Sequence, residues 1–350
     1  MEKKLVLSSS PHVASDDSVK KIMWTVNASL IPAIFAAYYY FGLKALILIG
    51  VSIITAVITE AACEKFMNRP ITISDGSAVL TGILLAFCVP AKLPWWAAAV
   101  GSFFAVAVVK QVFGGLGYNI FNPALAGRTF LLAAYPVLMT SWSAPEANIN
   151  ILPQKPPVSQ EISVQKVDTT SSATPLAELR IAREQGNLDK IKSLTTSSQI
   201  YKNLIVGNRS GSLGETSVIC LLIGAAILFL RGIITWHIPF SYIFSVFIFV
   251  LIFEFFGGKS YMSAFYYVLS GGLILGAFFM ATDMVTSPVT LIGRVLFGVG
   301  AGLLTVLIRY FSGPPEGVAY SILIMNATTP LIDRYTRPKI FGFVKPIKTK

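Results

Sequence analysis

Charged side chains are scarce in this sequence, and long hydrophobic runs take their place. Asp, Glu, Lys and Arg together make up 13% of the 350 residues, whereas hydrophobic residues make up 54%. Soluble domains carry about 25% charged residues. Together with the mean hydropathy of +0.68, this composition excludes an ordinary soluble globular domain and indicates a polytopic membrane protein.

Cysteine and histidine are scarcer still, which disfavours several kinds of redox or metal centre. The three cysteines all fall within apolar segments, and no two of them form a Cys-x-x-Cys pair. Such a set favours neither a disulfide framework nor an iron–sulfur cluster held by this chain alone. The two histidines lie far apart in the sequence and predict no metal site. A Gly-x-Gly-x-x-Gly fingerprint for a dinucleotide is also absent.

The basic residues collect between and after the apolar runs, which argues against nucleic acid as a partner. The formal net charge is +11, but no basic stripe interleaved with aromatic residues is present. Counted over short loops, the positive residues predict that both termini are cytoplasmic. The N-terminal residues lack the apolar core and cleavage site of a signal peptide. The expected location is therefore the cell (inner) membrane, with the lipid bilayer around the chain.

Ten apolar runs are long enough, or nearly so, to cross a bilayer, which takes about 20 residues. They are 22–41, 45–66, 78–89, 95–113, 123–135, 218–230, 238–255, 264–281, 295–311 and 318–331. We therefore predict an all-α polytopic membrane protein with about ten transmembrane helices. The expected segments are a cytoplasmic N-terminal segment (1–21), a first five-helix repeat (22–139), an extracytoplasmic loop (140–214), a second five-helix repeat (215–333) and a basic cytoplasmic tail (334–350).

The two halves share weak internal similarity. An odd number of spans in each half means that similar halves are inverted relative to each other. An asparagine-containing motif at 119–124 has a counterpart at 325–330, and glycine-rich segments occupy matching places at 81–87 and 270–278. Inverted repeats with interrupted helices place ligand sites between the halves. Independent helices that share common membrane residues are the alternative, because glycine is frequent in membrane helices.

Asn119, Asn122 and Arg128 form the first candidate site. They lie beside a Gly-Gly break in an apolar stretch, where an unpaired amide is costly and usually has a partner or a ligand. Asparagine amides both donate and accept hydrogen bonds, which suits the imide edge of a flavin ring. A flavin pocket and a hydrogen-bonded cluster between helices are both compatible with these residues.

Acidic residues in or near the spans give two further candidates. Asp283 is expected either to cap the segment that follows it or to face a cation path. Glu60 and Glu64 are spaced so that they share one face of a helix, near its inner end. We expect these glutamates to be solvated or paired with Lys65 or Arg69 rather than to bind an ion.

Thr174 is distinctive within the long polar interval because a proline follows it. Proline is favoured at the first position of a helix, so Thr174 is predicted to be the N-cap of a helix through 176–183. A phosphate esterified to Thr174 would lie at the positive end of that helix, where backbone N–H groups are free. An ordinary capped surface helix is the alternative.

Three long motifs resemble one family of membrane subunits. They are FGGLGYNIFNPALAGR at 113–128, SDGSAVLTG at 74–82 and ATDMVTSP at 281–288. In this order along the chain they are similar to the D subunit of the Rnf ferredoxin:NAD oxidoreductase, which is related to the B subunit of the sodium-pumping NADH:quinone oxidoreductase. The resemblance covers nearly all of the chain, from about residue 19 to residue 337.

The resemblance implies two flavins. In that family a Ser/Thr-Gly-Ala-Thr sequence in the outer loop carries FMN as a phosphoester on its last threonine. The matching residues here are Ser171, Ser172, Ala173 and Thr174, with Ser172 in place of the motif's glycine. The acceptor hydroxyl is expected to be accessible to a flavin transferase. A noncovalent riboflavin is implied within the membrane part, with Asn119 and Asn122 as its expected contacts.

By the same resemblance, the chain is a membrane electron-transfer subunit of a complex that couples ferredoxin:NAD electron transfer to sodium or proton translocation. It would be an oxidoreductase subunit that is incomplete alone. The implied partners are other membrane and peripheral subunits, including a second flavin-bearing subunit and iron–sulfur subunits. The residues themselves leave two alternatives: an inverted-repeat secondary transporter or channel without a redox role, and a structural membrane anchor.

Overall fold

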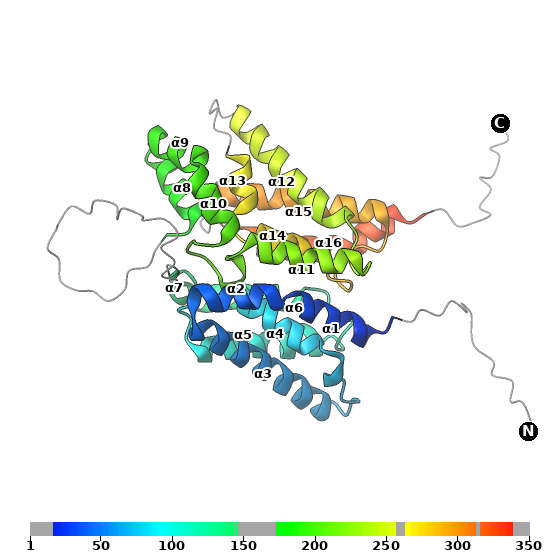
Figure 1. The fold of residues 1–350 in the computed structure, drawn as a ribbon. Helices are drawn as coiled ribbons and strands as arrows, with labels where there is room; N and C mark the ends of the chain where they lie inside the picture. Colours follow the sequence, from blue (N-terminus) through cyan, green and yellow to red (C-terminus); the bar gives the residue numbers. More distant parts are fainter. Residues whose placement is uncertain (1–16, 144, 146–172, 257–262, 313–315, 339–350) are drawn as a thin grey trace, which may run out of the picture.

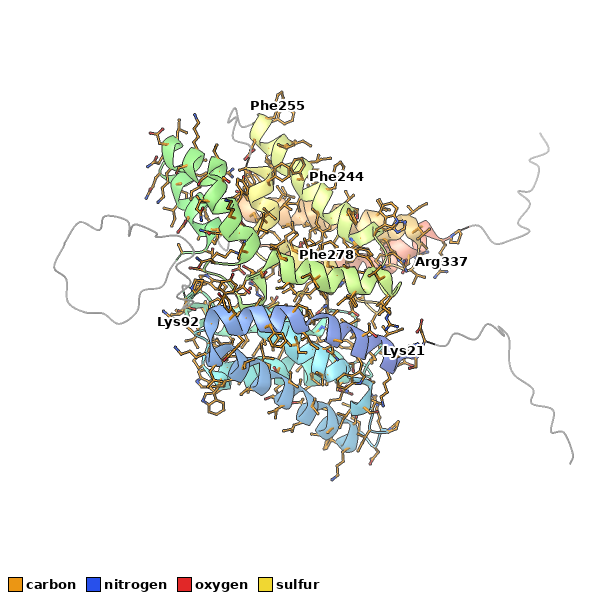
Figure 2. The ribbon with its side chains drawn as sticks, in the orientation of Figure 1. Lys21, Lys92, Phe244, Phe255, Phe278 and Arg337 are labelled. Carbon is orange, nitrogen blue, oxygen red and sulfur yellow. The ribbon has the colours of Figure 1, made fainter. Side chains whose placement is uncertain are left out.

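The computed structural model describes residues 17–143, 145, 173–256, 263–312 and 316–338, and every regular element in these ranges is a helix. Figure 1 shows two stacked groups of helices, one from each half of the chain, with α8, α9 and α10 at one end of the body. Lys21 and Arg337 lie together at the other end, whereas Lys92 lies near the end that carries α8 (Figure 2). The ends of the described chain and the helices α8 to α10 thus lie at opposite ends of the body.

The first half begins with a bent helix where the sequence predicts a continuous one. Helix α1 ends at Ser29 and α2 starts at Ile31, because Pro32 in the first turn of α2 has no N–H to continue the helix. The other elements follow the predicted runs closely. The elements of this half are α1 (Val19–Ser29), α2 (Ile31–Phe41), α3 (Leu43–Phe66), the 3₁₀ turn η1 (Ile73–Asp75), α4 (Ser77–Phe87), α5 (Trp95–Phe104), the π-helical segment η2 (Ala105–Gln111), α6 (Pro123–Ala134) and α7 (Pro136–Met139).

The second half contains a helix broken at its glycines. Gly271 and Gly272 both have positive φ angles, which side-chain-bearing residues rarely adopt, and they separate α13 from α14. The remaining elements are α8 (Pro175–Glu184), α9 (Leu188–Thr196), α10 (Ser198–Val206), the 3₁₀ turn η3 (Leu213–Glu215), α11 (Val218–Leu230), α12 (His237–Phe256), α13 (Ala264–Leu269), α14 (Leu273–Leu275), the π-helical segment η4 (Gly276–Met280), α15 (Leu291–Phe311) and α16 (Val318–Thr336).

The lengths and surfaces of the helices are those of a membrane protein. Four stretches among the described residues are long and apolar enough to cross a bilayer, namely Val19–Phe41, Leu43–Phe66, His237–Phe256 and Leu291–Phe311. Shorter apolar helices accompany them at Ser77–Phe87, Trp95–Gln111 and Val218–Leu230. Large side chains such as Phe244 and Phe255 point away from the body, as lipid-facing residues do (Figure 2). The prediction of an all-helical, multi-pass membrane protein is confirmed.

The two halves share one hydrophobic core. Helix α11 packs against α1 and α2, and α16 packs against α6. The approach of α11 to α1 is close: a Cβ atom on Gly224 would lie 2.2 Å from the carbonyl oxygen of Ser29, so only glycine fits there. Small residues at such crossings let membrane helices pack tightly.

Candidate functional site

A cavity lies between the two halves, which we call the inter-half cavity. It encloses about 750 Å³ of empty space, part of it open to solvent. Its wall combines α1, α4, η2 and the start of α6 with α11, η4 and the turn after η4, and most of the lining is apolar. The polar side chains in the wall include Lys110, Asn119, Asn122 and Asp283. A mostly apolar lining with a few polar groups is typical of small-molecule pockets.

Asn122 is placed in that wall by its role as a helix cap. Its Oδ1 accepts a hydrogen bond from the backbone N–H of Leu125 at 3.2 Å, at the start of α6. Its Nδ2 donates to the carbonyl oxygen of Met280 at 3.2 Å, and its backbone N–H donates to Oδ1 of Asn326 at 3.3 Å. Asn122 therefore ties the first half to the second.

Asn119 differs from Asn122 because one of its side-chain polar atoms has no hydrogen-bond partner. Its Nδ2 donates to the carbonyl oxygen of Phe121 at 3.1 Å, but its Oδ1 is buried without a hydrogen-bond partner in the structure. A buried acceptor without a partner costs free energy unless a ligand or water fills the need. The side chain is 5% exposed and lines the inter-half cavity. The Oδ1 atom of Asn119 is therefore the atom in the wall best suited to accept a hydrogen bond from a ligand.

Arg128 does not join the two asparagines. It forms an ion pair with Glu316, just before α16, and both side chains are nearly buried. The small pockets beside Arg128 include Glu215 and Gly271 but neither asparagine. The sequence spacing placed the three residues in one candidate site, but a residue almost two turns into a helix extends away from the cap.

Asn326 is the residue that sequence reasoning did not select. Besides accepting from Asn122, it donates from Nδ2 to the carbonyl oxygen of Thr286 at 3.1 Å. It lies in the motif at 325–330 that parallels 119–124. The two motifs therefore meet at one contact, and their similarity was the signal available in the sequence.

Glu60 corrects the expectation of a solvated acidic pair. It is 1% exposed and forms an ion pair with Lys110, 2.5 Å from its Oε1 to the lysine Nζ. Lys110 also donates to Ser77 Oγ at 2.6 Å, and Gln111 donates to Glu60 at 3.0 Å. Lys110 lines the inter-half cavity, so one member of this buried charge pair belongs to its wall.

The other acidic candidates have local partners. Glu64 is also buried, and its carboxylate accepts hydrogen bonds from the backbone N–H and the hydroxyl of Thr72. Among the described residues, the expected pairing of this carboxylate with Lys65 or Arg69 is not formed. Asp283 accepts from the hydroxyl of Thr286 at 3.1 Å and so closes the turn that follows η4. Asp283 also lines the inter-half cavity, so it both closes this turn and faces the cavity.

Thr174 is the N-cap of α8, as predicted. Its Oγ1 accepts a hydrogen bond from the backbone N–H of Ala177 at 3.3 Å, and Pro175 occupies the first helical position. The expectation of an accessible hydroxyl is wrong for this conformation, because Thr174 is only 5% exposed. Ala173 is exposed, while Ser171 and Ser172 lie outside the described residues.

Thr174 and the inter-half cavity lie toward opposite ends of the body. Figure 1 shows α8 at the end away from the termini, whereas α1, which lines the cavity, starts where the described chain begins. Among the described residues no group of three or more His, Cys, Asp or Glu side chains could hold a metal ion, and the three cysteines are free thiols. These two places offer hydrogen-bonding groups, apolar side chains, the charged Lys110 and Asp283, and a capped helix end.

Comparison with known proteins gives consistent matches over nearly the whole chain. The model of the NQR2, RnfD, RnfE family matches residues 6–342. The chain is 46% identical over 336 residues to the D subunit of the proton-translocating ferredoxin:NAD(+) oxidoreductase complex of Clostridium ljungdahlii, covering 96% of each chain. It is 43% identical over 345 residues to the D subunit of the Na(+)-translocating complex of Acetobacterium woodii, covering 98% of this chain and 97% of that one.

A more distant relative extends the same pattern. The chain is 34% identical over 352 residues to the D subunit of the ion-translocating oxidoreductase complex of Cronobacter sakazakii, covering 96% of this chain and 98% of the relative. The match to the family model and these full-length identities agree with one another. The chain therefore belongs to the NQR2, RnfD, RnfE family.

Proposed function

We propose that this chain is the membrane-embedded electron-transfer subunit of an ion-translocating ferredoxin:NAD oxidoreductase complex. The names of its relatives support this, since they are D subunits of such complexes. Those relatives move protons in one case and sodium in the other, so the proposal covers either cation. Partner subunits, among them a second flavin-bearing subunit and iron–sulfur subunits, would supply the centres that this chain does not hold.

The proposal includes FMN bound as a phosphoester to Thr174. The observation that carries it is the capped N-terminus of α8, where the Thr174 oxygen already accepts a backbone N–H. A phosphate diester on that oxygen gains from the helix end behind it. Flavins supply one- and two-electron chemistry, and the protein supplies their position.

The proposal also places a noncovalent riboflavin in the inter-half cavity. The cavity is mostly apolar, with Phe278 and Phe279 in its wall, which suits a flat aromatic ring. The unpartnered Oδ1 of Asn119 suits the imide N–H of that ring. Asn122 would hold the wall through its links to Met280 and Asn326.

The architecture proposed for this function is ten spans in two inverted five-helix repeats, divided by an extracytoplasmic loop at 140–214. In each half a long second helix, α3 or α12, packs against α5 or α15. A short or broken element follows it, α4 in one half and α13 to η4 in the other. Both termini are proposed to be cytoplasmic, in the cell (inner) membrane.

Mass spectrometry of the tryptic peptide 167–180 tests the covalent flavin. Protein made together with its flavin transferase should carry FMN on this peptide, and Thr174→Ala should lose the fluorescent band in a denaturing gel. Thr174→Val is the matched control for shape, and it should lose the band as well. An unmodified wild-type peptide would disprove the covalent assignment. It would favour the alternative function, an inverted-repeat transporter or channel that has no redox role.

Flavin released by denaturation tests the second flavin in the same preparation. Asn119→Leu should lower the riboflavin released per chain, because the cavity loses its free acceptor. The covalent FMN on Thr174 serves as the internal reference and should not change. Unchanged riboflavin in this variant would contradict the contact proposed for Asn119.

A further inference from the structure

Arg183 lies in a closed cage near the end of α8, the helix that Thr174 caps. Its guanidinium donates to the hydroxyl of Tyr267 at 2.7 Å, to Glu254 Oε1 at 3.1 Å and to Ser263 Oγ at 3.3 Å. Its Cζ atom lies 5.3 Å from the ring centre of Tyr267 and 4.9 Å from that of Tyr310. Ion pairing, hydrogen bonding and cation–π contact act on one side chain.

The cage is built by helices of the second half, not by the loop itself. Glu254 comes from α12, Ser263 and Tyr267 from the start of α13 and its first turn, and Tyr310 from α15. The Glu254 side chain is only 6% exposed, so without Arg183 its charge would be buried without a cation. The partners of Arg183 thus connect α8 to three elements of the membrane body.

The charge of Arg183 persists in this environment. Burial lowers the pKa of its guanidinium, but Tyr267, Tyr310 and Glu254 outweigh that effect and raise the pKa above its ordinary value. The side chain is 18% exposed. A permanent cation therefore joins α8 to the body over the whole physiological pH range.

The first turn of α8 is held separately, on α13 and the break that follows it. The hydroxyl of Tyr266 donates to the carbonyl oxygen of Pro175 at 2.8 Å. Leu176 packs on Gly271 so closely that a Cβ atom there would lie 2.4 Å from its Cδ1. Between these points, Arg180 donates from Nη1 to the carbonyl oxygen of Ser312 at 2.6 Å. Attachments along one rigid helix fix its direction as well as its place, and Arg183 is the attachment farthest from Thr174.

We propose that Arg183 is a positioning residue for the group carried by Thr174, because its cage fixes α8 against α12, α13 and α15. The inference rests on the proposed function only for the identity of that group as a flavin. Arg183 itself touches neither the reacting atoms nor Thr174. Its loss would let α8 move and the attached group with it.

Amide hydrogen exchange in the full-length flavin-loaded protein tests the clamp. We expect Arg183→Gln to speed exchange in 175–184 about tenfold or more, because α8 opens more often. Arg183→Lys keeps the charge but not the planar guanidinium. Its exchange rate in 175–184 should therefore lie between those of wild type and Arg183→Gln. Lys192→Gln on α9 removes an equal charge from an exposed site and is the matched control.

The fluorescence anisotropy of the covalent flavin is the second readout, and a purely structural role elsewhere in the body would not move it. We expect the anisotropy to fall in Arg183→Gln while the covalent flavin content per chain stays that of wild type. Exchange and anisotropy equal to those of Lys192→Gln would overturn the proposal. Should Arg183→Gln not accumulate, Arg183→Lys decides by the same two measurements.

The outcomes separate this inference from the proposed function. Faster exchange in 175–184 in a protein without flavin on Thr174 supports the clamp and refutes the covalent flavin. Flavin on Thr174 with unchanged exchange and anisotropy in Arg183→Gln refutes the clamp and leaves the proposed function intact.

Discussion

At the residue scale, the stability of this protein depends on buried charges that have a partner of opposite sign. Lys110 lies in the wall of the inter-half cavity and pairs with Glu60, and both side chains have almost no exposure. Removing one partner of such a pair leaves the other charge buried and alone, which is far more costly than removing both. The pair is therefore best probed by single and double substitution.

We predict that Lys110→Met lowers the free energy of unfolding by about 3–5 kcal/mol. The double variant Glu60→Gln, Lys110→Met should recover most of that loss, because no uncompensated charge remains. Thermal unfolding in detergent gives the comparison. A double variant no more stable than the single one would contradict the ion pair as the cause.

Glu178 on α8 predicts a pH dependence that is confined to the helices at the loop end. Burial raises the pKa of its carboxyl, although Lys190 acts in the opposite direction. The folded state therefore binds the proton more tightly than the unfolded state, so local stability rises as pH falls from neutral toward the ordinary carboxyl pKa and then levels off. Glu178→Gln should remove this dependence. Exchange in 175–184 between pH 7 and pH 5, corrected for intrinsic rates, measures it.

At the element scale, close contact between helix backbones determines which glycines can be replaced by a larger residue. Gly82 in α4 meets α3 so closely that a Cβ atom would lie 2.7 Å from the Cα atom of Ile53. Backbone atoms cannot move aside as a side-chain end can. By contrast, a Cβ on Gly50 of α3 would meet nothing within 4 Å.

We predict opposite effects for the two smallest substitutions on this helix pair. Gly82→Ala should destabilise the fold by about 1–3 kcal/mol through overpacking. Gly50→Ala should stabilise it by up to about 1 kcal/mol, because alanine is the better helix former. The melting temperatures of the two variants in one detergent give the test, and equal shifts of one sign would contradict the close contact.

A parallel between the long helices α3 and α12 supports the proposed inverted repeat. Each carries a buried glutamate at the same number of residues from the start of its helix, Glu60 in one and Glu254 in the other. Glu60 binds Lys110 beside the inter-half cavity, whereas Glu254 binds Arg183 of α8. Equivalent carboxylates at opposite ends of the body are what an inverted repeat would produce.

The arrangement of the whole molecule predicts which residues share a side of the membrane. Lys21 and Lys92 are exposed and lie at opposite ends of the body (Figure 2). In a background with the three cysteines replaced by alanine, we expect Lys92→Cys to react with an impermeant maleimide added to intact cells. Lys21→Cys should react only after the membrane is broken. The reverse pattern would invert the proposed orientation.

The sequence predicted most of the helices because apolar length is a strong local signal, and the cap at Thr174 because proline marks a helix start. It placed Asn119 and Asn122 in one cavity through their shared break. It did not predict the Glu60–Lys110 pair, whose partners lie on different elements far apart in the chain, nor the bend at Leu30. Arg128 was grouped by nearness in sequence, but the helix carries it to another pocket.

The burial of Thr174 has a consequence for maturation of the protein. A transferase that esterifies this hydroxyl needs access to an atom that is 5% exposed and already engaged as a helix cap. Flavin attachment would therefore precede the docking of α8 or require its temporary release, including that of Arg183. The order of biogenesis would then be insertion, modification and closure, with closure sealing the ester against the membrane body.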